Sequence, residues 1–207
     1  MATPQPPSAR DAPPTAKRQA VQAAVLTATE ELLREGASYA DLRIERIATR
    51  AGISRTAFYF YFRDRRELLM RLTEDVNDLL YAQADIWWSG SGDPAAEMRE
   101  ALTNISALYE QHGVLLRAIV EVSTYDEEVA AFWRGLVGRF VEATRRRIER
   151  EQRAGAVDGA LDAEATAFSL CWMTERVLYE VLVAEHAPGA ARLVDALCGI
   201  WVRSVYP

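Results

Sequence analysis

The sequence contains very few of the residues from which metal centres and catalytic sites are usually built. Its 207 residues include only two cysteines, Cys171 and Cys198, and two histidines, His112 and His186. None of the four stands at a zinc-binding spacing from another, and two distant cysteines do not make a disulfide scaffold. No acid, base and nucleophile converge in the pattern either. We therefore expect no metal, no cofactor and no enzymatic activity.

Long hydrophobic runs are also missing. Although 50% of the residues are hydrophobic, no apolar stretch approaches the roughly 20 residues that a membrane-spanning helix needs. The first residues do not combine a basic start with the apolar core of a signal peptide. We therefore expect a cytoplasmic protein that has no membrane partner.

Proline and glycine are sparse except in two places. Five of the eight prolines fall near the N-terminus, at Pro4, Pro6, Pro7, Pro13 and Pro14. This stretch has almost nothing to bury, so residues 1–16 are predicted to form a disordered arm. The turn-forming cluster at residues 89–94, SGSGDP, is the clearest later break in the chain.

Nearly all of the remaining chain has a helical pattern. Apolar residues recur at spacings of three and four, and no alternating strand pattern of useful length occurs. The expected helices cover, approximately, residues 15–35, 43–50, 54–60, 64–88, 94–111, 113–123, 126–154, 162–186 and 189–205. The prediction is an all-α fold of about nine helices, with a small three-helix domain at 17–63 and a larger helical bundle at 64–207.

Charge is distributed unevenly between these two parts. The formal net charge is −6, yet residues 1–71 carry 12 Lys or Arg against 8 Asp or Glu, and residues 72–207 carry 12 against 22. A basic first third joined to an acidic remainder is typical of a protein that meets nucleic-acid phosphates at one end.

Residues 44–62 have the layout of a helix-turn-helix. Ala48 is small where two helices must cross closely, and Gly52 can adopt the left-handed conformation that a tight turn requires. Phe58 and Phe62, four residues apart, are predicted to face inward. Five consecutive aromatic residues cannot all do so on one helix, so the others should lie outside.

Polar residues are left on the outer face at the start of the third helix, which is the part that enters a major groove. Arg55 can pair with a guanine edge, and Thr56 can reach a base with its hydroxyl or its methyl group. Neighbouring hydroxyls and positive charges suit phosphates, although a solvated surface explains any single arginine about as well. The candidate DNA-binding residues are Arg43, Ser54, Arg55, Thr56, Tyr59, Tyr61 and Arg65.

Residues 52–62, GISRTAFYFYF, followed by Arg65, resemble the signature of the tetracycline-repressor family of bacterial regulators. The pieces at 173–176, MTER, and 200–206, IWVRSVY, resemble the ethionamide-resistance repressor subfamily. The resemblance covers nearly the whole chain after residue 16. It implies a homodimer on double-stranded, pseudo-palindromic operator DNA, whose two heads are spread apart when a small ligand binds the C-terminal domain.

Two helical faces of the C-terminal part are candidates for binding that ligand. An apolar stripe along 133–144 ends in a hydroxyl, which on spacing alone is more typical of a core, while Thr174 and Glu175 could orient an otherwise apolar ligand. The resemblance adds positions that line the subfamily's pocket. The candidate ligand-binding residues are Met98, Leu102, Ile105, Trp133, Leu136, Phe140, Thr144, Cys171, Thr174, Glu175, Tyr179 and Trp201.

The last two helices carry apolar side chains on more than one side. These are Val181, Leu182, Val183, Leu193, Val194, Leu197 and Ile200. The resemblance implies that two such helix pairs form the homodimer interface, and a broader monomer core is the alternative. The sequence thus predicts a ligand-responsive transcriptional regulator, a repressor released by a small hydrophobic effector. A helical carrier of a hydrophobic metabolite and an activator of the same architecture are the other hypotheses.

Overall fold

The structure, a computed structural model, describes residues 16–184 and 189–206. The arm predicted for residues 1–16 lies outside this range except for Ala16, where the first helix begins. The described residues contain no strand, so the prediction of an all-α fold is confirmed. Their helices are α1 (Ala16–Arg34), α2 (Ile44–Arg50), α3 (Arg55–Tyr61), α4 (Arg65–Trp88), α5 (Pro94–Gln111), α6 (Gly113–Ser123), α7 (Glu127–Ala154), α8 (Ala163–Leu178), the π-helical turn η1 (Tyr179–Val183) and α9 (Ala190–Val205).

The chain forms two compact units, which divide between Leu72 and Thr73. The division falls inside α4, whereas the sequence pattern suggested a boundary before Asp64. The first two turns of α4 belong to the N-terminal unit and include the fully buried Leu68 and Leu69. Because the division falls within a continuous helix, no change in composition marks this domain boundary in the sequence.

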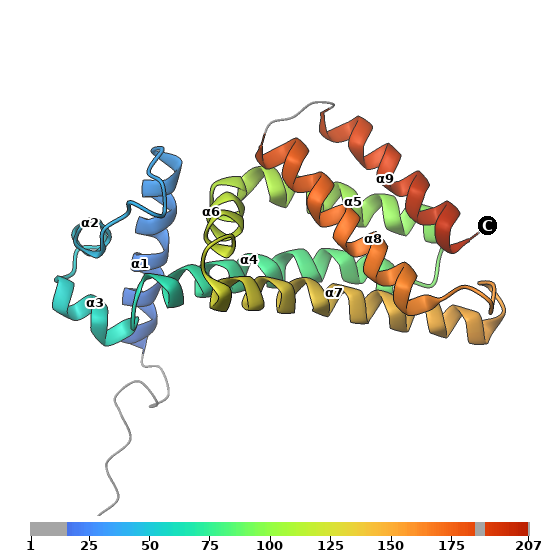
Figure 1. Cartoon of the computed structure of the whole chain (residues 1–207), viewed down its shortest axis with the longest axis horizontal. Helices are drawn as coiled ribbons and strands as arrows, with labels where there is room; N and C mark the ends of the chain where they lie inside the picture. The colour runs from blue at the N-terminus through green and yellow to red at the C-terminus, as the bar shows by residue number, and fades with distance from the viewer. Residues whose placement is uncertain (1–15, 185–188, 207) are drawn as a thin grey trace, which may run out of the picture. The chain divides into compact units, whose positions relative to one another are not determined.

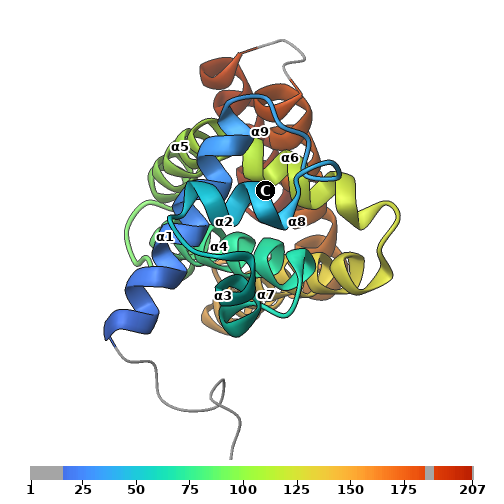
Figure 2. The same ribbon diagram turned by 90° about the vertical axis from the view of Figure 1, so that its left-hand side faces the viewer.

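The N-terminal unit is built from α1, α2, α3 and the start of α4 (Figure 2). α1 ends at Arg34, and Gly36 follows with a φ of 91°, a left-handed conformation that glycine adopts without strain. Gly52, with a φ of 70°, makes the turn between α2 and α3. The Ser54 hydroxyl oxygen accepts a hydrogen bond from the Ala57 amide at 3.1 Å and caps α3. The predicted inward position of Phe58 is confirmed, since its side chain is fully buried.

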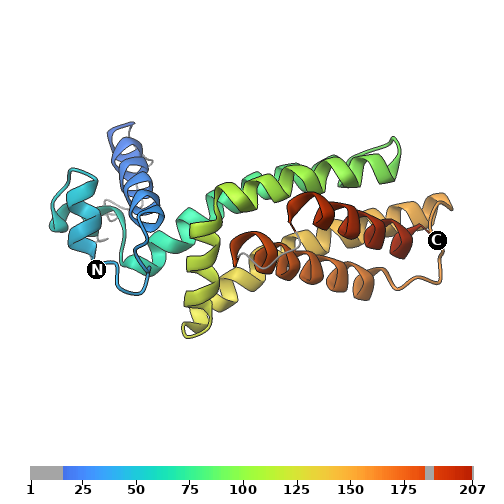
Figure 3. The same ribbon diagram turned by 90° about the horizontal axis from the view of Figure 1, so that it is seen from above.

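The C-terminal unit is a bundle in which α7 packs on α8 and α5 packs on α9 (Figures 1 and 3). α6 runs across the direction of the other helices of this unit and contacts α7 (Figure 3). Three of its helices begin at an aspartate whose carboxylate accepts backbone amide hydrogen bonds, Asp93, Asp126 and Asp162. Such caps fix helix starts locally, which explains why these boundaries match the sequence prediction.

The end of α8 differs from the prediction. The sequence pattern suggested one helix through residue 186, but α8 ends at Leu178 and the chain continues as the π-helical turn η1. The carbonyl of Val183 accepts a hydrogen bond from Arg117 of α6, which ties η1 to another helix. A π turn inserts one residue into the helical register, and apolar periodicity does not reveal that insertion.

Candidate DNA-binding surface and ligand cavity

The start of α3 presents an exposed polar surface. Arg55 and Thr56 are exposed there, while Tyr59 is half-buried one turn later. Arg55 Nη1 lies 2.7 Å from Glu45 Oε1, and its guanidinium stands 5.8 Å from the centre of the Tyr59 ring. Hydrogen bonding with Tyr59, followed by the charge of Glu45, raises the pKa of Arg55, so the guanidinium stays charged. α3 therefore offers a positive, forked donor whose direction is constrained by α2.

The remaining α3 positions divide between capping and aromatic packing. Ser54 is exposed, and although its oxygen is engaged in the cap, its hydroxyl can still donate. The Tyr61 ring, half-buried, meets Phe60 edge-on at 5.4 Å between centroids. Phe60 is 50% exposed and was not among the predicted contacts. The run of five aromatic residues was the signal that one of them had to lie outside.

The two other predicted arginines differ in their surroundings. Arg43 is exposed at the start of α2 and makes no side-chain capping bond. Arg65 Nη1 donates instead to the carbonyls of Tyr39 at 3.1 Å, Ala40 at 2.9 Å and Leu42 at 2.7 Å. The Tyr39 hydroxyl in turn donates to the Arg65 carbonyl. Arg65 thus holds the loop between α1 and α2 against the start of α4, a contact that sequence spacing could not indicate.

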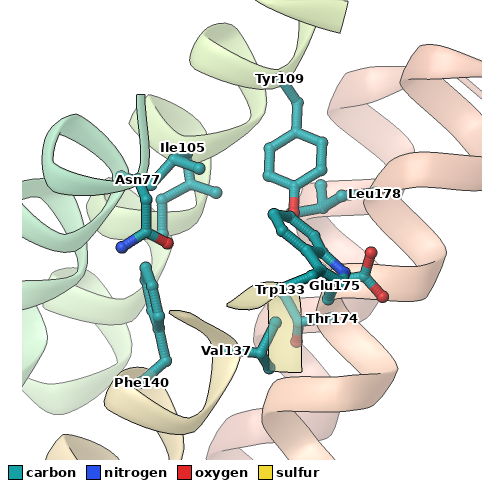
Figure 4. A pocket seen from close by; sticks show the side chains of 10 residues that line it. Asn77, Ile105, Tyr109, Trp133, Val137, Phe140, Thr174, Glu175 and Leu178 are labelled. Carbon is teal, nitrogen blue, oxygen red and sulfur yellow. The ribbon is translucent and has the colours of Figure 1, made fainter. Parts of the chain in front are cut away.

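Two adjoining cavities lie inside the C-terminal unit. The first, which we call the Glu175 chamber, has a cavity volume of about 70 Å³, and the second, the Thr144 chamber, also about 70 Å³. Ile105, Phe140 and Thr174 line both chambers, which are therefore neighbours. The Glu175 chamber (Figure 4) is lined by Asn77, Leu80, Ile105, Tyr109, Trp133, Val137, Phe140, Thr174, Glu175 and Leu178. The Thr144 chamber is lined by Ala84, Trp87, Trp88, Met98, Ala101, Leu102, Ile105, Phe140, Thr144, Cys171, Thr174 and Trp201.

All the predicted ligand-binding residues except Leu136 and Tyr179 line one or both chambers. Val137 lines the Glu175 chamber in place of Leu136, because adjacent helical residues point about 100° apart. Tyr179 begins η1 and lies under the guanidinium of Arg176. The sequence pattern did not predict the lining side chains of α4, which include Asn77, Trp87 and Trp88.

Most polar groups of the Thr144 chamber have partners, although the buried Trp87 Nε1 has none among the described residues. Trp88 Nε1 donates to Thr144 Oγ1 at 3.0 Å, and Trp201 Nε1 donates to Thr174 Oγ1 at 2.8 Å. Cys171 Sγ lies 3.5 Å from the Thr144 hydroxyl, and burial raises the pKa of this thiol to about 12, so it stays protonated. Because the two threonine oxygens are occupied by indole N–H groups, this chamber presents a mainly apolar surface.

The Glu175 chamber is different because two of its polar side chains, Glu175 and Asn77, have polar atoms without partners among the described residues. Glu175 is only 7% exposed, and neither carboxylate oxygen has a hydrogen-bond partner among the described residues. Asn77 is 4% exposed, and its Nδ2 also has no hydrogen-bond partner among the described residues. Its side chain lies across the chamber from Glu175 (Figure 4). Burial raises the pKa of Glu175, partly opposed by Arg176, and burial also raises the pKa of Tyr109. Buried polar groups are nearly always satisfied, so these two are candidates for contact with a ligand or a water molecule.

Neither a metal site nor a membrane segment is found in the described part of the chain. No group of three or more metal-ligating side chains occurs within residues 16–184 and 189–206. Over the same ranges, every helix is too short or too polar to cross a lipid bilayer.

A helix-turn-helix unit joined to a helical bundle with an internal cavity defines the class of the protein: it is a helix-turn-helix transcriptional regulator. Residues 25–72 match the family described as bacterial regulatory proteins, tetR family, and residues 98–207 match the C-terminal domain of the transcriptional regulator EthR. The chain belongs to the TetR family and carries the EthR type of C-terminal domain. Regulators of this family bind operator DNA and dimerise.

Two relatives cover most of the chain. The HTH-type transcriptional regulator EthR of Mycolicibacterium smegmatis is 31% identical over 190 residues, which are 88% of this chain and 85% of the relative. EthR of Mycobacterium tuberculosis is 32% identical over 188 residues, 87% of this chain and 85% of the relative. These similarities extend through both units.

Solved structures share the fold at lower identity. SmeT of Stenotrophomonas maltophilia, a repressor of a multidrug efflux pump, superposes with a TM-score of 0.73 at 18% identity and covers 92% of each chain. A putative TetR-family regulator from Mesorhizobium loti also gives a TM-score of 0.73, at 17% identity. The match covers 93% of this chain and 100% of the Mesorhizobium loti chain. At this identity the likeness establishes the fold.

Proposed function

We propose that the protein is a repressor that binds operator DNA as a homodimer and leaves it when a small hydrophobic effector fills the two chambers. The observation that carries the proposal is the combination of an exposed, positive α3 in one unit with a largely apolar cavity in the other. The protein acts by binding and works in the cytoplasm, where operator DNA is found; the similarity to relatives named as HTH-type transcriptional regulators supports this proposal.

For DNA contact, we propose that α3 enters the major groove. Arg55 and Thr56 read base edges from its exposed first turn, while Ser54, Tyr59 and Tyr61 contribute hydroxyls to phosphates. Arg43 adds a charge at the start of α2. The engagement of Arg65 with three loop carbonyls supports a positioning role for this residue, which holds the head in its binding shape.

For dimerisation, we propose an interface on α8 and α9. Phe168 is 56% exposed and stacks near Trp172 with 6.2 Å between ring centroids, and Ile200 is 38% exposed. Large apolar side chains that face solvent together favour a partner surface. The interface is narrower than the sequence pattern suggested, because Val183, Leu193, Val194 and Leu197 are buried within the chain itself.

The experiment measures fluorescence anisotropy of labelled DNA from upstream of the protein's own gene against a scrambled duplex, at two salt concentrations. We expect tight, salt-sensitive binding to the upstream DNA and much weaker binding to the control. A folded dimer that ignores both duplexes would contradict the proposal and favour a helical carrier of a hydrophobic metabolite. Tighter DNA binding on filling the cavity, together with increased transcription, would favour an activator.

A further inference from the structure

We propose that the effector is an elongated molecule with a basic amine at one end, whose ammonium group binds Glu175 while its apolar body fills the Thr144 chamber. This inference rests on the proposed function, because it names the chemistry of the ligand that the regulator senses. It starts from the carboxylate of Glu175, which is buried at 7% exposure and lacks a hydrogen-bond donor among the described residues.

No positive charge inside the chamber compensates Glu175. The residues that line this chamber in the described structure include no lysine, arginine or histidine. Arg176 follows directly in sequence, but its Nη1 lies 3.2 Å from Glu180 Oε1 and its guanidinium stands 5.4 Å from the Tyr179 ring centre. A buried carboxylate without a partner is costly, and an ammonium group supplies both the missing charge and the missing donors.

The chamber walls also suit a cation. Tyr109, Trp133 and Phe140 bring three aromatic rings to the space that Glu175 borders (Figure 4). The faces of aromatic rings attract positive charge, and an ammonium group enclosed by rings and one carboxylate is a recurring arrangement. A ligand carboxylate would meet like charge at Glu175, and an alcohol would provide a donor without the compensating charge.

The rest of the ligand is defined by the second chamber. Ile105, Phe140 and Thr174 border both spaces, so the two chambers are adjacent, and the proposed ligand extends from the Glu175 chamber into the Thr144 chamber by displacing these side chains. There the hydroxyls of Thr144 and Thr174 already accept from Trp88 and Trp201, so apart from the unpartnered Trp87 Nε1 the described lining is apolar. An apolar body with an amine at one end matches this division of polar groups.

The test compares three probes that share an apolar body: 4-phenylbutylamine, 4-phenylbutan-1-ol and 4-phenylbutanoate. Each is titrated into the full-length protein at neutral pH by isothermal titration calorimetry. We expect the amine to bind about tenfold or more tightly than the alcohol, in line with hydrogen bonds to charged groups, and the carboxylate to bind weakest. Glu175→Gln should abolish the preference for the amine.

Two control variants separate this role from general effects. Glu164→Gln removes an exposed carboxylate from the first turn of the same helix and should leave the preference unchanged. Asn77→Leu removes the other unpartnered polar group of the chamber and should change the affinity for all three probes alike. The three-probe comparison on the unaltered protein decides the matter even if a variant fails to fold.

The inference would be overturned if the unaltered protein bound amine and alcohol equally, if it did not bind the amine, or if Glu175→Gln kept the full preference. Operator anisotropy measured with each probe separates this failure from failure of the proposed function. DNA release by the alcohol as readily as by the amine would overturn the amine assignment and leave the regulator intact. A protein that prefers the amine but never binds DNA would support the assignment and contradict the proposed function.

Discussion

Arg55 of α3 is paired with Glu45 of α2 across 2.7 Å between Nη1 and Oε1. Both side chains are more than half exposed, at 61% and 54%, so the pair contributes little to folding stability. The pair instead orients Arg55, because it holds the forked guanidinium at the exposed start of the proposed recognition helix. Two predictions follow from this placement and three from other contacts.

Replacing Arg55 tests whether its fork reads a base. Arg55→Ala should lose about tenfold or more discrimination at one base pair in each half-site, since a bidentate contact to guanine is removed. Arg55→Lys keeps the charge but not the fork, so it should lose the same discrimination while retaining most non-specific affinity. Anisotropy against operators altered one pair at a time measures both. Uniform weakening by both variants on every sequence would assign Arg55 to phosphate instead.

Replacing Glu45 tests the pairing itself. Glu45→Gln removes a negative charge near the DNA-facing helix, so affinity for scrambled DNA should rise several-fold. Operator affinity should rise less, because Arg55 loses the contact that orients it. The ratio of operator to scrambled affinity should therefore fall. An unchanged ratio would show that Glu45 does not position Arg55.

Arg65 is expected to act on stability. Arg65→Ala deletes hydrogen bonds to three loop carbonyls and should destabilise the N-terminal unit by about 1–3 kcal/mol. Arg63→Ala is the matched control, because the Arg63 side chain is 63% exposed and pairs with Glu67, four residues later in the sequence. It should change the free energy of unfolding little. Denaturant unfolding measures this, and an equal stability loss in both variants would contradict the assigned role.

Arg147 should be the most costly arginine to remove. Its side chain is 4% exposed, pairs with Glu151 and donates to the carbonyl of Gly90, tying α7 to the loop after α4. Arg147→Met should cost about 3–5 kcal/mol by leaving a carboxylate buried without its partner. The double change with Glu151→Met should recover part of this loss. Arg146→Met, at an exposed neighbouring position, serves as the control and should have little effect.

Glu175 should make the empty protein less stable at neutral pH than at mildly acidic pH. Its pKa is raised above the ordinary 4.5 by burial and by Glu180, and is partly lowered by Arg176. As pH rises above the ordinary value of 4.5, Glu175 ionises freely in the unfolded chain, whereas in the folded chain its charge would be buried. The free energy of unfolding therefore falls as pH rises. Glu175→Gln should therefore raise Tm by a few °C at neutral pH. The difference should shrink as pH falls below 4.5, and a difference constant with pH would contradict this cause.

Most of the helices could be predicted because their causes are local. Asp93, Asp126 and Asp162 cap helix starts with their own side chains, and Gly36 and Gly52 adopt the left-handed conformations that end or turn a helix. The spacing of apolar residues then indicates which face of each helix is buried. The same spacing placed most cavity residues correctly on helix faces, although it could not distinguish a cavity wall from a packed core.

Contacts between distant segments needed the tertiary structure. The engagement of Arg65 depends on a loop some 23–26 residues earlier, and the occupied hydroxyls of Thr144 and Thr174 depend on tryptophans from other helices. The sequence by itself determined the helical fold, the helix-turn-helix and the basic head, because periodicity, caps and charge are properties of neighbouring residues. Only the tertiary structure decided which buried polar groups remain without partners, since that depends on every side chain packed around Asn77 and Glu175.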